Sequence, residues 1–398
     1  MKQIQITTVG EVCQTISDTY RANAEQVTLI NTSDVLDGRV LNHARVPNEG
    51  LKGQFKKTFK RDDILYSEIR PQNKRYAFVD FNPVNYIAST KLMVIRADES
   101  KVLPMYLYYF LKSAPVVAEL QLLAETRSGT FPQITFSELA NLEIPVPAVS
   151  EQKAIVTTIK CIEDRITCNE NINDNLQQQA EAIYHDWFID FKPFGGTMPE
   201  TWCIGTLADL AADIICGKTP STKRTEYYGS DTPFITIPDM HNQVYAVTTE
   251  RSLSVLGAKS QAGKILPHNS TCVSCIGTAG LVCLVARPSQ TNQQVNSIVP
   301  KADASPYYIY LLAQTLSDTI QRLGSGGSTI CNLNKAQFAR IEALIPSSEA
   351  MRDFDNLIAP MFDAIMRNQQ ENQHLTSLRN TLLPKLMSGE IDVSSIEI

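Results

Sequence analysis

The 398-residue sequence lacks the features that mark exported, membrane-spanning or disulfide-rich proteins. No stretch approaches 18 consecutive apolar residues, and the first residues, MKQIQITTVGEVC, contain no apolar segment behind a basic start. Nine cysteines, an odd number without a regular spacing, are typical of reduced thiols rather than of a disulfide framework. We therefore expect a cytoplasmic protein with no membrane partner.

Motifs of nucleotide-dependent chemistry are also missing. The sequence has no Gly-Lys-Ser/Thr loop of the kind that cradles phosphates, which argues against ATP hydrolysis. A base-directed methyltransferase needs a Gly-rich cofactor loop and an Asn/Asp-Pro-Pro-aromatic tetrad, whereas the nearest segments, NPVN (82–85) and DTPF (231–234), deviate from that tetrad and are typical of turns. Cys272 and Cys275 have no second pair at zinc-finger spacing. We expect no catalytic residue, no metal and no cofactor.

What the sequence does contain is an internal repeat of about 200 residues. A heptad-like series between Ile155 and Trp187 recurs 199 positions later, between Phe354 and Leu386, and both of its asparagines recur in register. We predict two long helices of one pattern, each roughly 50 Å long at about 1.5 Å per residue. The predicted helix–helix interface consists of Ile155, Ile159, Ile162, Ile166, Asn169, Asn173, Leu176, Ile183, Ile358, Met361, Ile365, Asn368, Asn372, Leu375, Leu382 and Leu386.

The ends of the two patterns agree with this interpretation. Ser150-Glu151 and Ser348-Glu349 supply a capping hydroxyl and an acid at each start, and glycines follow each end. Pro360 and Pro384 lie inside the second pattern, so we expect them to kink or shorten that helix.

Two arrangements of the helices remain open. Each helix could pack on its own domain, or the two could pair antiparallel as a rod with a domain at each end. Four asparagines in the middle of the series are poor for a domain core and common in coiled coils whose register they set, which favours the pair.

The charge distribution is uneven along the chain. The formal net charge is −6, but residues 39–75 contain ten Lys or Arg and only four Asp or Glu. A local surface can therefore bind phosphates although the whole protein is acidic. A solvated loop that merely keeps the surface soluble explains the same residues about as well.

Two segments are candidates for contacts with DNA. In GQFKKTFKRDDILYSEIRPQNKRY (53–76) aromatic residues alternate with cations, and in GKTPSTKRTEYY (217–228) small hydroxyl residues accompany cations in a predicted turn. The candidate residues are Lys56, Lys57, Lys60, Arg61, Arg70, Lys74, Arg75, Lys218, Thr219, Ser221, Lys223, Arg224 and Tyr227.

These features together resemble the specificity subunits of type I restriction-modification systems. The most specific segments are residues 125–155 before the first helix (ETRSGTFPQITFSELANLEIPVPAVSEQKAI), residues 380–393 (NTLLPKLMSGEIDV), and residues 198–240 with the later QTNQQVNSIVP (290–300). The resemblance covers nearly the whole chain.

The resemblance implies an α+β fold in which two mixed α/β target-recognition domains, residues 1–149 and 195–347, are separated by an antiparallel pair of long helices within residues 150–194 and 348–398. It implies a non-catalytic subunit that binds double-stranded DNA, each domain reading one half of a split, asymmetric target while the helices set the spacer. Two methyltransferase subunits would dock on the helices, and restriction subunits, which carry the motor and nuclease activities, would join through them. The alternatives are a coiled-coil assembly scaffold that binds no DNA and a stand-alone methyltransferase.

Overall fold

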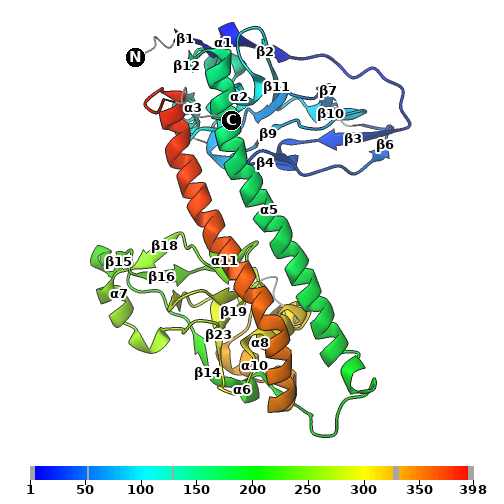
Figure 1. Cartoon of the computed structure of the whole chain (residues 1–398), viewed down its shortest axis with the longest axis vertical. Helices are drawn as coiled ribbons and strands as arrows, with labels where there is room; N and C mark the ends of the chain where they lie inside the picture. The colour runs from blue at the N-terminus through cyan, green and yellow to red at the C-terminus, as the bar shows by residue number, and fades with distance from the viewer. Residues whose placement is uncertain (1–4, 52, 128–129, 326–330, 393–398) are drawn as a thin grey trace. The chain divides into compact units, whose positions relative to one another are not determined.

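The computed structural model describes residues 5–51, 53–127, 130–325 and 331–392. The chain divides into unit 1, residues 1–164 and 376–398, and unit 2, residues 165–375 (Figure 1). Both units contain mixed sheets, short helices and segments of the two long helices α5 (Val149–Phe188) and α11 (Ser348–Met387). The predicted α+β class with a repeated layout is confirmed.

Unit 1 contains a central sheet of strand order β2-β11-β8-β9, a second sheet β6-β3-β10-β7, and the strand pairs β1-β12 and β4-β5. Its elements are β1 (Gln5–Thr8), α1 (Val9–Val12), β2 (Cys13–Ile16), β3 (Gln26–Ile30), η1 (Thr32–Asp34), β4 (Val35–Leu36), β5 (Arg39–Val40), β6 (Val46–Pro47), β7 (Phe55–Lys57), β8 (Ile64–Ser67), η2 (Pro71–Asn73), β9 (Tyr76–Phe78), β10 (Tyr86–Ser89), β11 (Leu92–Ala97), α2 (Pro104–Lys112), α3 (Ala114–Arg127), α4 (Phe136–Ala140) and β12 (Glu143–Val146).

Unit 2 repeats this plan, with a central sheet β14-β23-β19-β21-β17, a second sheet β15-β18-β16-β22, and the pairs β13-β25 and β20-β24. Its elements are η3 (Lys192–Phe194), β13 (Cys203–Thr206), α6 (Leu207–Leu210), β14 (Ala211–Cys216), η4 (Thr225–Tyr227), β15 (Tyr228–Gly229), β16 (Thr232–Ile235), η5 (Ile237–Met240), β17 (Tyr245–Ala246), β18 (Arg251–Leu253), α7 (Val255–Lys259), η6 (Ala262–Lys264), β19 (Thr271–Ser274), β20 (Ile276–Gly277), β21 (Val282–Val285), β22 (Gln290–Thr291), β23 (Val295–Pro300), α8 (Pro306–Thr315), α9 (Ser317–Ser325), β24 (Cys331–Asn332), α10 (Lys335–Ala339) and β25 (Glu342–Ile345).

The central sheet of each unit is buried on both faces. Because side chains alternate along a strand, Ile64 and Tyr66 of β8 pack toward α2, whereas Leu65 packs toward the second sheet. In unit 2, Val273 of β19 belongs to the core that includes α8, and Cys272 belongs to the opposite core. The cysteine-containing strand is thus a sheet strand with two buried faces.

Both long helices contain 40 residues, and α11 continues through Pro360 and Pro384. The prediction that these prolines shorten the helix is wrong. A proline removes one backbone hydrogen bond, but Ile358 and Phe362 on either side of Pro360 are completely buried in the unit 2 core and hold the backbone in place. Pro384 stands in the last turn, where Leu383 and Leu386 are buried in unit 1.

Candidate nucleic-acid interface and helix pair

The basic segment of unit 1 forms two separate stretches, one around β7 and one around η2. Lys56, Lys60 and Arg61 in the first stretch are exposed. Asp63, which is fully buried, fixes the turn that presents them: its carboxylate accepts hydrogen bonds from the backbone N–H of Lys60 at 2.8 Å and from both sides of the Arg96 guanidinium at 2.7 and 2.8 Å. The turn therefore displays cations from a rigid base.

Lys57 behaves differently from its neighbours. Its ammonium donates to the backbone carbonyls of Thr90 and Leu92 at 3.0 and 2.8 Å, and burial lowers its pKa. This side chain connects β7 to the strands beside it, so it positions the segment.

The second stretch also mixes exposed and occupied cations. Arg70 and Lys74 flank η2, and both are exposed. Their backbones adopt the left-handed conformation, with φ of 43° and 53°. Arg75 instead donates to the carbonyls of Ser33 and Val35 at 3.0 and 3.3 Å, and Lys74 lies 3.8 Å from Asp37. Arg70 is the cation of this stretch that has the freest access to solvent-borne phosphate.

In unit 2 the candidate loop, residues 217–227, is anchored at its start. A Cβ on Gly217 would lie 2.1 Å from the carbonyl oxygen of Asn292, so only glycine fits there. Lys218 donates its backbone N–H to Thr291, and its carbonyl accepts from Gln261 at 2.7 Å. Gln261 is in turn hydrogen-bonded to the completely buried Gln290 at 2.9 Å.

Beyond this anchor the loop exposes polar and cationic side chains. Lys218, Ser221, Lys223 and Arg224 are exposed, and Thr219 donates to Gln293 at 2.7 Å. The Arg224 guanidinium lies 5.2 Å from the centre of the Tyr227 ring and donates to its hydroxyl at 2.6 Å. An arginine held against an aromatic ring keeps its charge and loses little rotamer entropy on binding.

The middle of the helix pair is polar, and its contacts lie within unit 2. Asn169 donates to Asn372 at 2.8 Å, and Asn368 donates to Asn173 at 2.9 Å. From the first pair to the second, the residue number increases along α5 and decreases along α11, so the two segments run antiparallel. Arg165 binds Glu371 with both sides of its guanidinium at 3.0 and 2.8 Å, which holds the pKa of Glu371 below its ordinary value.

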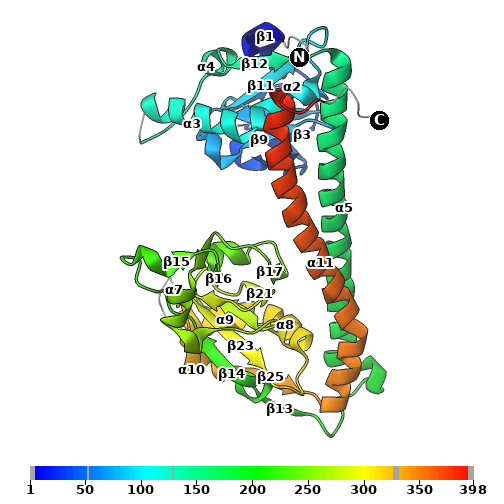
Figure 2. The ribbon, with the colours of Figure 1, turned by 60° about the vertical axis from the view of Figure 1, so that its left-hand side comes forward.

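The apolar positions of the predicted interface lie on either side of this polar section, and the two helices are side by side within each unit (Figures 1 and 2). Those buried in a unit's core are Ile155, Ile159 and Leu386 in unit 1 and Ile358 and Ile365 in unit 2; those partly buried are Ile162 and Leu382 in unit 1 and Ile166, Leu176, Ile183, Met361 and Leu375 in unit 2. Several pack against the unit's own sheet and helices, as Figure 2 shows for α8 beside α11. Each helix thus contacts both its partner helix and the domain beside it.

Glu163 of α5 connects this helix to α2 and to α11 within unit 1. Its carboxylate accepts hydrogen bonds from Tyr109 at 3.0 Å and from Arg379 at 3.3 Å, and it forms an ion pair with Lys112. The Lys112 side chain is only 8% exposed, and its ammonium lies 4.7 Å from the ring centres of both Tyr108 and Tyr109. Burial lowers the pKa of Lys112, although Glu163 acts in the opposite direction.

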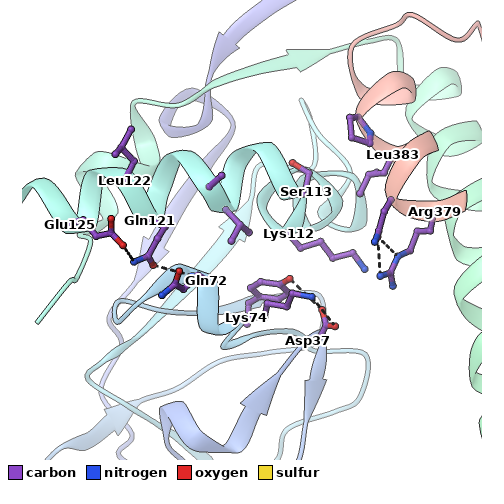
Figure 3. Close-up of a pocket in the computed structure, with 16 residues that line it drawn as sticks. Asp37, Gln72, Lys74, Lys112, Ser113, Gln121, Leu122, Glu125, Arg379 and Leu383 are labelled. Carbon is purple, nitrogen blue, oxygen red and sulfur yellow. Dashed lines mark hydrogen bonds and ion pairs between the residues drawn. The ribbon is translucent and has the colours of Figure 1, made fainter. Parts of the chain in front are cut away.

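A cavity of about 560 Å³ in unit 1 opens beside these groups (Figure 3). Lys112 of α2 and Arg379 of α11 point toward it, with Asp37 and Lys74 on the opposite wall (Figure 3). Apolar side chains such as Val117 and Leu383 complete the lining. Because cations and acids are mixed around it, the cavity favours no single ligand charge.

The sequence predicted neither the role of Glu163 nor the hydrogen-bonded pair Gln261–Gln290. One signal existed for Glu163: at the offset of 199 it corresponds to Phe362, so an acid replaces a buried aromatic residue. Arg379 likewise corresponds to the fully buried Ala180. Two opposite charges at apolar positions of one repeat indicate an ion pair.

Potential metal ligands are few in the described part of the chain. His185, Asp186 and Asp190 bring three ligand atoms within 4.8 Å of one another, but Lys192 forms ion pairs with both carboxylates. Burial raises the pKa of Cys275 to about 12, so its thiol stays protonated at neutral pH. Among the described residues no helix is long and apolar enough to cross a membrane.

Comparison with known proteins gives consistent matches over most of the chain. The model of the type I restriction modification DNA specificity domain matches twice, at residues 1–178 and 199–378. The HindI type I restriction enzyme specificity subunit of Haemophilus influenzae is 38% identical over 96% of this chain and 98% of its own, and the MjaIX specificity subunit of Methanocaldococcus jannaschii is 24% identical over 79% and 77%. A crystal structure of a type I restriction-modification S subunit from M. genitalium covers 97% of each chain with 16% identity and a TM-score of 0.58, which shows a shared fold.

Proposed function

Since the chain belongs to the type I restriction modification DNA specificity family, we propose that each of its two units reads one half of a bipartite DNA target. The duplication is the observation that carries this proposal. The specificity domain occurs twice, and the two copies expose different basic segments, around β7 and η2 in unit 1 and in the 217–227 loop of unit 2. Different reading surfaces require different half-sites, so the target is asymmetric.

The contacts to DNA divide by chemistry. Exposed cations bind phosphates and set the register, and arginine and small polar side chains contact bases. The proposed contact residues are Lys56, Lys60, Arg61, Arg70 and Lys74 in unit 1 and Lys218, Thr219, Ser221, Lys223, Arg224 and Tyr227 in unit 2. Lys57 and Arg75 donate to backbone carbonyls of unit 1, so they hold the same segments in place and do not contact DNA.

Catalysis belongs to partner subunits in this proposal. Two methyltransferase subunits dock on α5 and α11, restriction subunits join through them, and the complex acts on DNA in the cytoplasm. The helices fix the spacer between half-sites, because each is a continuous helix whose residues belong to both units.

A domain exchange tests independent reading. Residues 1–145 are replaced by the equivalent segment of a relative, and methylated adenines are mapped in cells that also carry the methyltransferase subunit. We expect one half-site to change and the other to stay. A simultaneous change in both half-sites contradicts two independent readers.

The spacer role has its own test. Insertion of one helical turn into both α5 and α11, in their polar middle sections, should widen the unread spacer without altering either half-site. An unchanged spacer removes this role from the helices.

Salt dependence separates the proposal from an assembly scaffold that binds no DNA. Affinity of the chain with its methyltransferase partner should fall steeply as salt rises from about 50 to about 200 mM, because phosphate contacts release counterions. Binding that is absent, or insensitive to salt, favours the scaffold.

A further inference from the structure

Each unit contains a small two-stranded antiparallel sheet just before one long helix starts. In unit 1, β1 pairs with β12, and Ile6 stands opposite Pro145. In unit 2, β13 pairs with β25, and Ile204 stands opposite Leu344. The two sheets have the same sequence of exposed and buried positions along both strands.

The outer faces of these sheets carry the same chemistry. Residues directly opposite one another, and residues two apart on one strand, share a face. The unit 1 face therefore combines Ile6 and Pro145 with Thr8 and the exposed Glu143. The unit 2 face combines Ile204 and Leu344 with Thr206 and the exposed Glu342.

An isoleucine at the centre of each face is unusually exposed. Ile6 is 65% exposed and Ile204 is 62% exposed, whereas Ile144 and Ala343 on the inner faces are 0% and 4% exposed. An exposed apolar centre with polar residues at its rim is typical of protein–protein contacts. Because both side chains are mostly exposed, they contribute little to the apolar surface that either unit buries on folding.

Ile6 and Ile204 hold the same place in their sheets and lie 198 positions apart in the sequence. Three other exposed apolar residues have no apolar counterpart at the offset of 199 that relates the long helices: Leu122 corresponds to Gln321, Ile172 to Glu371, and Leu357 to Thr158. The segments proposed to contact DNA also differ between the units. A surface that reads a different half-site in each unit has to differ, whereas a surface that meets two copies of one protein has to stay the same.

We propose that the β1-β12 and β13-β25 faces are equivalent docking sites, each for one copy of the same protein. The occupant is the methyltransferase subunit, so this inference rests on the proposed function and extends its docking surface beyond the helices. The matching chemistry is an apolar side chain over Ile6 or Ile204 and a lysine or arginine beside Glu143 or Glu342. Both contacts are available in each unit separately.

The test uses the full chain and its methyltransferase subunit in native mass spectrometry and titration. Ile6→Thr and Ile204→Thr keep a β-branched residue on an exposed strand position and should leave folding unchanged. Each single variant should weaken one of two bound copies at least tenfold, and the double variant should weaken both. Leu122→Thr, an equally exposed residue without a counterpart, is the matched control and should bind two copies as the wild type does.

Charge reversal provides a second, independent variant pair. Glu143→Lys and Glu342→Lys should reproduce the loss of one copy each. Two copies bound with wild-type affinity by the double isoleucine variant and by the double glutamate variant overturn the inference. Failure of the proposed function is distinguishable, because the wild-type complex would then methylate no bipartite sequence whatever the stoichiometry.

Discussion

Glu163 lies between Lys112 and Arg379 of unit 1, and neutralising it measures what this ion cluster contributes. In Glu163→Gln the amide cannot balance the charge of Lys112, whose side chain is 8% exposed. Breaking a buried ion pair costs about 3–5 kcal/mol. Because Glu163 is itself 25% exposed, and because Lys112 keeps its two tyrosine rings, we expect unit 1 to lose about 2–3 kcal/mol of stability.

The double variant Lys112→Met/Glu163→Leu removes both charges and keeps similar volumes. Replacing a buried pair by apolar residues is often neutral, and Arg379, which is 20% exposed, can turn toward water. We therefore expect the double variant to lie within about 1 kcal/mol of the wild type.

Thiol labelling of Cys13 provides the assay. Cys13 is buried in the unit 1 core, and burial raises its pKa to about 12, so it reacts only when unit 1 opens. A loss of about 2–3 kcal/mol corresponds to labelling about 30- to 150-fold faster. Both tryptophans, Trp187 and Trp202, belong to unit 2, so their emission serves as an internal control and should not change.

Equal labelling rates in the wild type and in Glu163→Gln would refute this reasoning. A double variant that is labelled as fast as the single variant would refute it as well, since the cost would then arise from poorer packing rather than from an unbalanced charge.

Three other features of the fold also predict measurable effects. Phe362→Ala should lower the free energy of unfolding by about 3–5 kcal/mol, because Phe362 is fully buried and its ring stacks on Tyr307 with ring centres 4.5 Å apart. The loss should appear as a lower urea midpoint of tryptophan emission. Leu357→Ala, at an exposed position, is the control and should change this free energy by no more than about 0.5 kcal/mol. Lys60→Ala combined with Arg61→Ala should lower the slope of log affinity against log salt by about one for each phosphate that the variant no longer binds, whereas Lys57→Met should reduce stability and leave that slope unchanged. Arg165 lowers the pKa of Glu371, so the Arg165–Glu371 ion pair stabilises the fold fully above the ordinary pKa of 4.5, and this stabilisation is lost as pH falls through the lower folded pKa. At pH 7 the thermal midpoint of the wild type should exceed that of Glu371→Gln, and this difference should close below pH 4.5.

Periodicity was sufficient to predict the repeat and the long helices. A seam that recurs at a fixed offset, with asparagines in register, is a signal that local sequence carries by itself. The asparagine partners Asn169–Asn372 and Asn173–Asn368 follow from that seam once the helices are antiparallel. The error at Pro360 arose because proline propensity is a local quantity, whereas Ile358 and Phe362 anchor the helix through the core of unit 2.

The sequence could not predict which individual cations stay exposed and which are hydrogen-bonded within the protein. Lys57 and Lys60 are three residues apart in the same basic run, yet the Lys57 ammonium is bound to carbonyls of residues more than thirty positions away. Such contacts depend on strand pairing, which the composition of the run does not encode. Composition shows that the segment is basic, and the fold determines which of its cations stay exposed.

Single-molecule mapping of methylated adenines, in a host that carries this chain with its methyltransferase and restriction partners, tests the central claim most directly. Two units with different reading surfaces predict one asymmetric motif, with two specified halves separated by a spacer of constant length. A palindromic motif, a spacer of variable length, or methylation without any sequence preference would contradict it.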